Sequence, residues 1–115
     1  MILQILQGVL GVMFVMAGSM KLMKAKEELA VRMGWVNDFS GTQVKLIGGV
    51  ELLSAIGLVV GLFVPGMILF SKIGMGLIVF IMLGASYTHL RRKEMGMAIF
   101  TLVLLGLAVW LGMSL

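Results

Sequence analysis

Four long stretches of this chain are almost free of charged residues, and they restrict the possible folds more than any motif does. They comprise residues 2–23, 42–63, 67–90 and 95–115. A helix needs about 20 mostly apolar residues to cross the hydrocarbon core of a bilayer. Only 12% of the chain is charged, against about 25% in an ordinary soluble domain. The sequence therefore predicts an all-α fold, an integral membrane four-helix bundle that forms a single domain over residues 1–115.

The first stretch has an alternative interpretation as a secretory signal peptide, because residues 17–19 (Ala-Gly-Ser) form a weak cleavage pattern. A signal peptide carries its positive segment before the apolar one. Here no Lys or Arg precedes the apolar residues, and the first basic residue is Lys21. We therefore expect residues 2–23 to be a membrane span.

The connections between the stretches differ in length and charge. Residues 64–67 (Val-Pro-Gly-Met) are typical of a type II turn, since Pro takes the second position and Gly the third. So short a connection predicts that the second and third spans form an antiparallel hairpin. Residues 24–40 form a longer polar connection, in which we expect a short interfacial helix with Trp35 and Phe39 at the level of the lipid headgroups.

The basic residues in the connections and at the ends of the spans predict the orientation in the membrane. Four spans place both termini on the same side as the turn at residues 64–67. The opposite side carries Lys21, Lys24, Lys26, Arg32, Arg91, Arg92 and Lys93. Because loops rich in Lys and Arg stay in the cytoplasm, we expect both charged loops to be cytoplasmic and both termini to lie outside.

Several classes of function are excluded or disfavoured by the residues present. The chain has no Cys, which excludes disulfide exchange, thiolate zinc sites and Cys-ligated iron–sulfur clusters. His89 is the only His, so one chain cannot supply two His ligands to a haem. Catalytic triads, phosphate-binding loops and metal-ligand clusters are also missing. We therefore predict no catalytic residue, no metal and no cofactor. We also predict no nucleic-acid partner, because the basic residues lie at the ends of the spans and do not form a patch.

Glu51 is the charge that is hardest to accommodate, since it lies near the middle of the apolar residues 47–65. A charge at this depth needs a partner, water or a proton. Helical spacing puts it on one face with small and apolar residues, namely Val44, Gly48, Ala55 and Leu58, so we expect it to point into the bundle. The candidate ion-pair partners are Lys21, Lys45 and Lys72. Either an ion pair fixes the helix packing, or Glu51 binds a ligand or proton.

The end of the third span holds a second group of polar residues, Tyr87, Thr88 and His89, next to the basic cluster. We expect Lys21, Glu51, Tyr87 and His89 to converge on a polar pocket that opens to the cytoplasm. Simpler interpretations exist for two of them. A His at a helix end is often interfacial or favoured by the helix dipole, and a Lys often extends its charged end to the membrane surface.

Three segments carry a family resemblance: residues 17–22 (AGSMKL), 46–53 (LIGGVELL) and 87–91 (YTHLR). They resemble the DoxX family, in particular its DoxX-like branch of small bacterial membrane proteins, and they supply Lys21, Glu51 and His89 in order. The resemblance covers nearly the whole chain and implies a four-helix bundle in the bacterial inner (plasma) membrane. Some relatives accompany oxidoreductases, and an animal relative is an endoplasmic-reticulum chaperone for nicotinic acetylcholine receptors.

Three functions follow as hypotheses. The first, favoured by the small size and missing catalytic motifs, is a non-catalytic accessory or chaperone-like protein whose partners are membrane lipids, other membrane proteins or further copies of itself. The second is a binder of a lipid, quinone or other hydrophobic small molecule, with Glu51 at the polar end. The third is a membrane subunit of an oxidoreductase complex that uses Lys21, Glu51 and His89. A deep cavity at Glu51 favours the second or third, and a dry ion pair with Lys favours the first.

Overall fold

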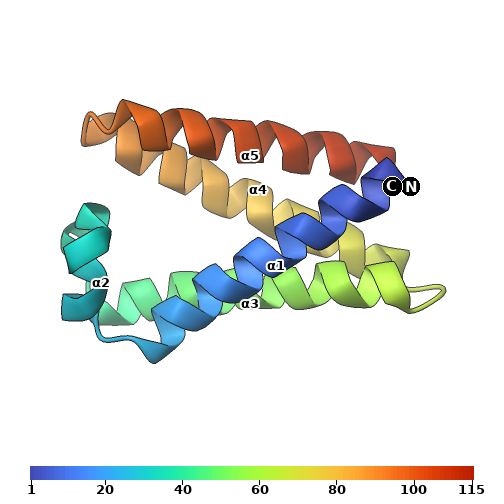
Figure 1. The fold of residues 1–115 in the computed structure, drawn as a ribbon, viewed down its shortest axis with the longest axis horizontal. Helices are drawn as coiled ribbons and strands as arrows, with labels where there is room; N and C mark the ends of the chain where they lie inside the picture. The colour runs from blue at the N-terminus through green and yellow to red at the C-terminus, as the bar shows by residue number, and fades with distance from the viewer.

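The computed structural model describes residues 1–115 and consists of helices joined by short connections (Figure 1). The four long helices are α1 (Ile2–Met23), α3 (Gly41–Phe63), α4 (Ile68–Arg91) and α5 (Met95–Ser114). Between α1 and α3 lie the short helix α2 (Lys26–Arg32) and the 3₁₀ helix η1 (Gly34–Asp38). The predicted all-α fold is confirmed, and each predicted span matches a long helix to within one residue at either end.

Local sequence signals explain where α3 begins and ends. Ser40 and Gln43 form a capping box at its start, in which each side chain bonds the other residue's backbone N–H, at 3.1 and 2.9 Å. After Phe63 the chain reverses through the predicted tight turn. Gly66 has a φ of 82°, and the N–H of Met67 donates to the carbonyl of Val64 at 3.2 Å. The type II turn and the α3–α4 hairpin are therefore confirmed.

The long helices are arranged as two pairs, and α3 has the central place. Helix α3 packs against α1 on one side and α4 on the other, and α4 packs against α5. Figure 1 shows both chain termini at the same end as the α3–α4 turn, which we call the hairpin end. The opposite end, with α2, η1 and the α4–α5 turn, is the loop end. There the α1–α3 pair lies well apart from the α4–α5 pair.

Glycines set how closely α3 approaches its two neighbours. A Cβ added to Gly18 of α1 would lie 2.6 Å from the carbonyl oxygen of Gly48 in α3. A Cβ added to Gly74 of α4 would lie 2.7 Å from the carbonyl oxygen of Ser54 in α3. Backbones in contact at such sites replace the hydrophobic effect as the source of packing energy in lipid. The α1 contact lies toward the loop end of α3, and the α4 contact lies toward the hairpin end.

The interior contains one main apolar cluster contributed by all four long helices. Its members are Leu10, Phe14, Ala55, Leu58, Met75, Ile78, Met82, Leu104, Ala108 and Leu111. A smaller cluster packs α2 and η1 against α3 and consists of Leu29, Val36 and Val44. The loop-end connection is therefore packed against the bundle.

Large apolar side chains also cover the outside of every long helix. Exposed examples are Ile5 and Val12 on α1, Leu46 and Leu53 on α3, Leu69 and Phe80 on α4, and Ile99 and Val103 on α5. Soluble monomers rarely expose contiguous apolar surface on this scale. All four long helices are long and apolar enough to cross a membrane. The chain is a multi-pass membrane protein, and lipid covers these side chains.

Candidate functional site

The side chain of Glu51 lies inside the bundle, at the position that helical spacing predicts. Its Oε1 accepts a hydrogen bond from Lys21 Nζ at 2.6 Å, and both side chains are buried. The close α1–α3 contact produces this pairing, because Gly48 lies one turn before Glu51 and a Cβ there would be 2.7 Å from Lys21 Cβ. The buried charge of Glu51 is thus balanced by Lys21 from the neighbouring helix.

The other two candidate partners of Glu51 lie elsewhere. Lys45 is exposed and donates to the carbonyl oxygen of Leu22 at 2.9 Å. Lys72 is exposed on α4, toward the hairpin end, and forms no ion pair. Sequence position did not separate the three lysines. Of the three lysines, only Lys21 lies beside Glu51, because the Gly18–Gly48 contact brings its face of α1 against α3.

One aromatic residue of the connection, Trp35, lies over Lys21, and a second, Phe39, packs against Trp35. Lys21 Nζ is 5.6 Å from the centre of the Trp35 ring, a distance at which a cation is attracted to the ring face. Trp35 in turn makes an edge-to-face contact with Phe39, with ring centres 5.7 Å apart. Trp35 was predicted only as a headgroup-level anchor. In the structure it also contacts the polar centre of the bundle.

His89 forms a side-chain hydrogen bond with Glu94 that was not predicted from the sequence. Its Nδ1 donates to Glu94 Oε1 at 2.8 Å, and the Glu94 N–H donates back to the His89 carbonyl at 2.8 Å. The chain reverses there because Lys93 adopts a left-handed conformation, with a φ of 61°, that ends α4. The hydrogen bond from His89, helped by Arg92, holds the pKa of the Glu94 carboxyl below its usual value.

A set of ion pairs joins η1 to the α4–α5 turn across the loop end. Arg92 Nη1 donates to Asp38 Oδ1 at 3.0 Å, and Arg91 Nη2 lies 3.7 Å from Asp38 Oδ2. Arg91 also lies over the ring of Tyr87, 5.9 Å from its centre. These contacts hold the connection against the end of α4, although α1–α3 and α4–α5 separate there.

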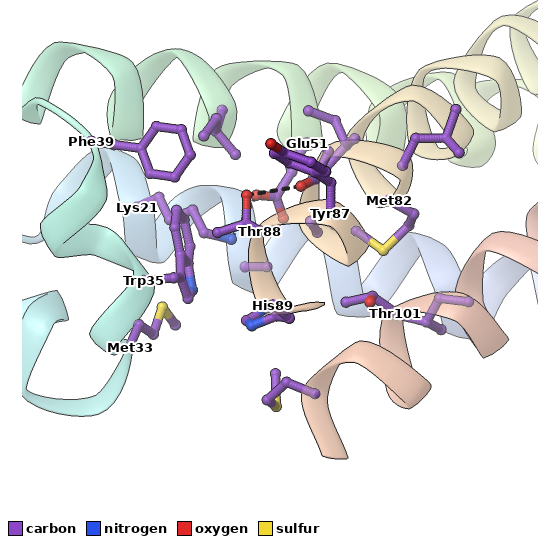
Figure 2. A pocket seen from close by; sticks show the side chains of 18 of the residues that line it. Lys21, Met33, Trp35, Phe39, Glu51, Met82, Tyr87, Thr88, His89 and Thr101 are labelled. Carbon is purple, nitrogen blue, oxygen red and sulfur yellow. Dashed lines mark hydrogen bonds and ion pairs between the residues drawn. The ribbon is translucent and has the colours of Figure 1, made fainter. Parts of the chain in front are cut away.

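A cavity of about 840 Å³ lies between the two helix pairs at the loop end. Sixteen of its 25 lining residues are hydrophobic, so most of its wall is apolar. The predicted residues Lys21, Glu51, Tyr87 and His89 all line it, together with Trp35, Phe39, Asp38, Thr88 and Arg91. Figure 2 shows the labelled side chains gathered around this one space from α1, the α2–η1 connection, α3, α4 and α5.

The polar atoms of the cavity retain hydrogen-bonding capacity. Lys21 Nζ uses one of its three protons on Glu51, and Glu51 Oε2 accepts no hydrogen bond. His89 is bonded only through Nδ1, so its Nε2 is also unbonded. Thr88 is already engaged, since its hydroxyl donates to the Gly84 carbonyl at 2.9 Å. The site can therefore donate to and accept from a polar group at one end of an apolar molecule.

The comparisons with known proteins agree with this architecture. The sequence profile of the DoxX-like family matches residues 5–111, which include α3, α4 and most of α1 and α5. The chain belongs to the DoxX-like family. No curated protein and no solved structure matches the chain.

Proposed function

We propose that the protein binds one hydrophobic or amphipathic small molecule in the loop-end cavity. The proposal rests on one observation: a single cavity of about 840 Å³ has both a mostly apolar wall and a cluster of polar groups. Pockets for small ligands typically measure about 300–1,000 Å³ and place a few polar groups in a mostly apolar lining. The body of the ligand would contact Phe14, Met82 and Leu104, and its polar end would face the polar residues of the same cavity, which include Lys21, Glu51, His89 and Arg91.

The ion pair serves binding as well as folding in this proposal. Lys21 and Glu51 neutralise each other, so the pair is tolerated inside the membrane without a ligand. Its spare protons and the unbonded Glu51 Oε2 are held in place by the Gly18–Gly48 contact. A polar group arriving in the cavity meets donors and an acceptor that are already positioned, which reduces the entropy lost on binding.

This proposal replaces the accessory function that the sequence favoured. Lipid accounts for the exposed apolar helix faces, and the buried Lys21–Glu51 pair, which was expected for an accessory protein, also lines the cavity and is equally compatible with a binding site. A catalytic function needs an acid and a base that act together within hydrogen-bond reach of a substrate, and no hydrogen bond joins His89 to Glu51 in this structure. The cavity is the feature that lipid contact leaves unexplained.

Filling the cavity tests the proposal. Gly84 lines the cavity, and a Cβ added there meets no atom within 4 Å. Gly84→Phe should therefore place a ring in the open side of the cavity, where it obstructs a ligand, without disturbing α4. Gly76→Phe is the matched control, because Gly76 lies on the same helix, is equally open and does not line the cavity.

The readout is the lipid that co-purifies with each protein in mild detergent, identified and quantified by mass spectrometry. We expect the wild type and Gly76→Phe to retain about one enriched molecule per chain, and Gly84→Phe to lose it. Equal amounts in all three proteins, in the proportions of the bulk membrane lipids, would reject the proposal.

We also propose that the loop end faces the cytoplasm of a bacterial inner membrane. Seven Lys or Arg residues at this end support the orientation. Since the chain has no Cys, a single cysteine at Ser114 or Lys24 can be labelled specifically in intact cells. A membrane-impermeant reagent should modify Ser114→Cys and leave Lys24→Cys unmodified. The reverse pattern would invert the topology.

A further inference from the structure

The charges at the cavity mouth indicate which class of molecule the site takes. We propose that the ligand is a single-chain amphiphile with an acidic head, whose head pairs with Arg91 and whose chain fills the cavity. This inference rests on the proposed function and goes further, because an apolar cavity alone would accept a neutral amphiphile equally well.

The acidic residues at the mouth are already paired, which leaves Arg91 as the available charge. Lys21 holds Glu51 at 2.6 Å, His89 holds Glu94 at 2.8 Å, and Arg92 holds Asp38 at 3.0 Å. Arg91 lies farther from Asp38, at 3.7 Å, and 60% of its side chain is exposed. It also lines the cavity. A ligand carboxylate can therefore bond this guanidinium without breaking a short ion pair.

The charge of the whole loop end also favours an anion. Residues 21–38 and 91–94 contain seven Lys or Arg residues and four Asp or Glu residues. The excess positive charge attracts an acidic head toward this end of the protein. An anionic group at the mouth is also close to the membrane surface, where its hydration is only partly lost.

One side of the cavity is open to lipid, which suits a hydrocarbon chain. Phe80 and Tyr87 line the cavity but are 72% and 65% exposed. They lie on one face of α4 with Gly84 between them, by the spacing of four and three residues. The absence of atoms near Gly84 keeps this face open. A chain can thus pass sideways from the bilayer into the cavity while its head stays at the mouth.

The size of the cavity favours one chain. Its volume of about 840 Å³ lies within the range of pockets that hold one small ligand, about 300–1,000 Å³. A phospholipid with two chains would leave one of them outside, against α4. A long-chain fatty acid matches both the apolar volume and the single available guanidinium.

The test compares oleic acid with oleyl alcohol, which share a chain and differ in the head. Delipidated protein is titrated with each compound, and the fraction carrying one ligand is measured by native mass spectrometry. We expect the acid to bind more tightly to the wild type. A hydrogen bond to a charged group contributes enough that Arg91→Gln should weaken oleate binding about tenfold. The same variant should bind oleyl alcohol normally, which shows that it is folded.

Two control variants separate specific pairing from general attraction. Arg91→Lys keeps the charge and should retain most of the oleate affinity. Arg32→Gln removes an exposed charge from the same end that does not line the cavity, so it should change binding little. Equal binding of acid and alcohol, or equal losses in Arg32→Gln and Arg91→Gln, would overturn the acidic-head inference while leaving the proposed function intact. If neither compound binds to the wild type, or if Gly84→Phe reduces the binding of neither one, both the acidic-head inference and the proposed function are overturned.

Discussion

The central helix α3 packs differently at the two ends of the bundle. At the hairpin end, α3 and α4 are in backbone contact through Gly57 and Gly74, and Gln7 Nε2 donates to the Leu58 carbonyl at 2.8 Å and to Ser71 Oγ at 2.7 Å. At the loop end, α3 stays close to α1 but separates from α4. The first end has small residues and a satisfied amide between its helices, and the second has a cavity lined by ionisable groups.

This difference shows what determines whether a membrane bundle closes. Helices in lipid approach closely where small residues allow backbone contact. Toward the loop end, the buried residues of α4 include Met82 and His89, which are large and line the cavity. The polar groups there are bonded to one another, so their burial does not require the helices to close. The hairpin end is thus built for packing, and the loop end leaves room for a ligand.

The largest predicted effect comes from breaking the ion pair at the loop end. Glu51→Leu leaves the buried Lys21 without its partner, and we expect a loss of about 3–5 kcal/mol in the free energy of unfolding. Denaturant titration in detergent micelles, followed by circular dichroism, measures this loss. A loss below about 1 kcal/mol, the value of an exposed ion pair, would mean that water reaches the pair freely.

Removing both charges sharpens this result. Replacing a buried ion pair by apolar residues of similar size is often neutral or stabilising. The double variant Lys21→Met with Glu51→Leu should therefore recover most of the stability lost in Glu51→Leu. It should not recover full ligand retention, because the cavity has lost two of the polar groups that face the ligand. Recovery of both properties would show that the pair has only a structural function.

A smaller effect distinguishes the closed end from the open one. Gly74→Ala places a methyl group against the backbone of α3, and we expect a destabilisation of about 1–3 kcal/mol from overpacking. Gly84→Ala and Gly76→Ala have free space for the methyl group. Both should be neutral or stabilise by up to about 1 kcal/mol, because Ala is the better helix former. Similar values for all three would mean that the two ends pack alike.

The smallest effect concerns the turn that positions Glu94. Lys93 has a φ of 61°, a conformation that Gly adopts with less strain. Lys93→Gly removes the strain of a left-handed side-chain-bearing residue, about 1–2 kcal/mol, and adds unfolded-state entropy worth about 0.5–1 kcal/mol, so the free energy of unfolding should rise by about 0.5–1 kcal/mol. Thermal unfolding of the variant, with Lys24→Gly as a control for the lost charge, measures the change. A decrease in stability specific to Lys93→Gly would indicate that its side chain contributes to the loop end.

The sequence was sufficient for the features that depend on local pattern. Apolar length located the spans, Pro65 and Gly66 located the hairpin, and helical spacing located the face of Glu51. It could not choose among Lys21, Lys45 and Lys72, because that choice depends on how far α1 and α3 slide past each other. The hydrogen bond of Glu94 with His89 depends on the turn at Lys93, and the ion pair of Asp38 with Arg92 depends on the docking of η1. A Lys in a left-handed turn leaves no clear sequence signal.

The cavity was the least predictable feature. Its lining comes from all four long helices and the connection, and its volume depends on the angle between the two helix pairs. No single segment encodes that angle. The polar residues expected to meet in a pocket do line one cavity, but its apolar wall, including Phe14, Met82 and Leu104, had no signal beyond ordinary span composition.

Photoaffinity labelling tests the central claim most directly, namely that an amphipathic molecule occupies the loop-end cavity. The protein, reconstituted in vesicles, is irradiated with a fatty acid that carries a diazirine at mid-chain, and the labelled residues are mapped by mass spectrometry. We predict labels on cavity residues such as Met82, Phe100 and Leu104, and their loss when oleic acid competes or when Gly84→Phe fills the cavity. Labels spread over lipid-facing residues such as Leu102, Val103 and Val109, unaffected by competitor, would contradict the account.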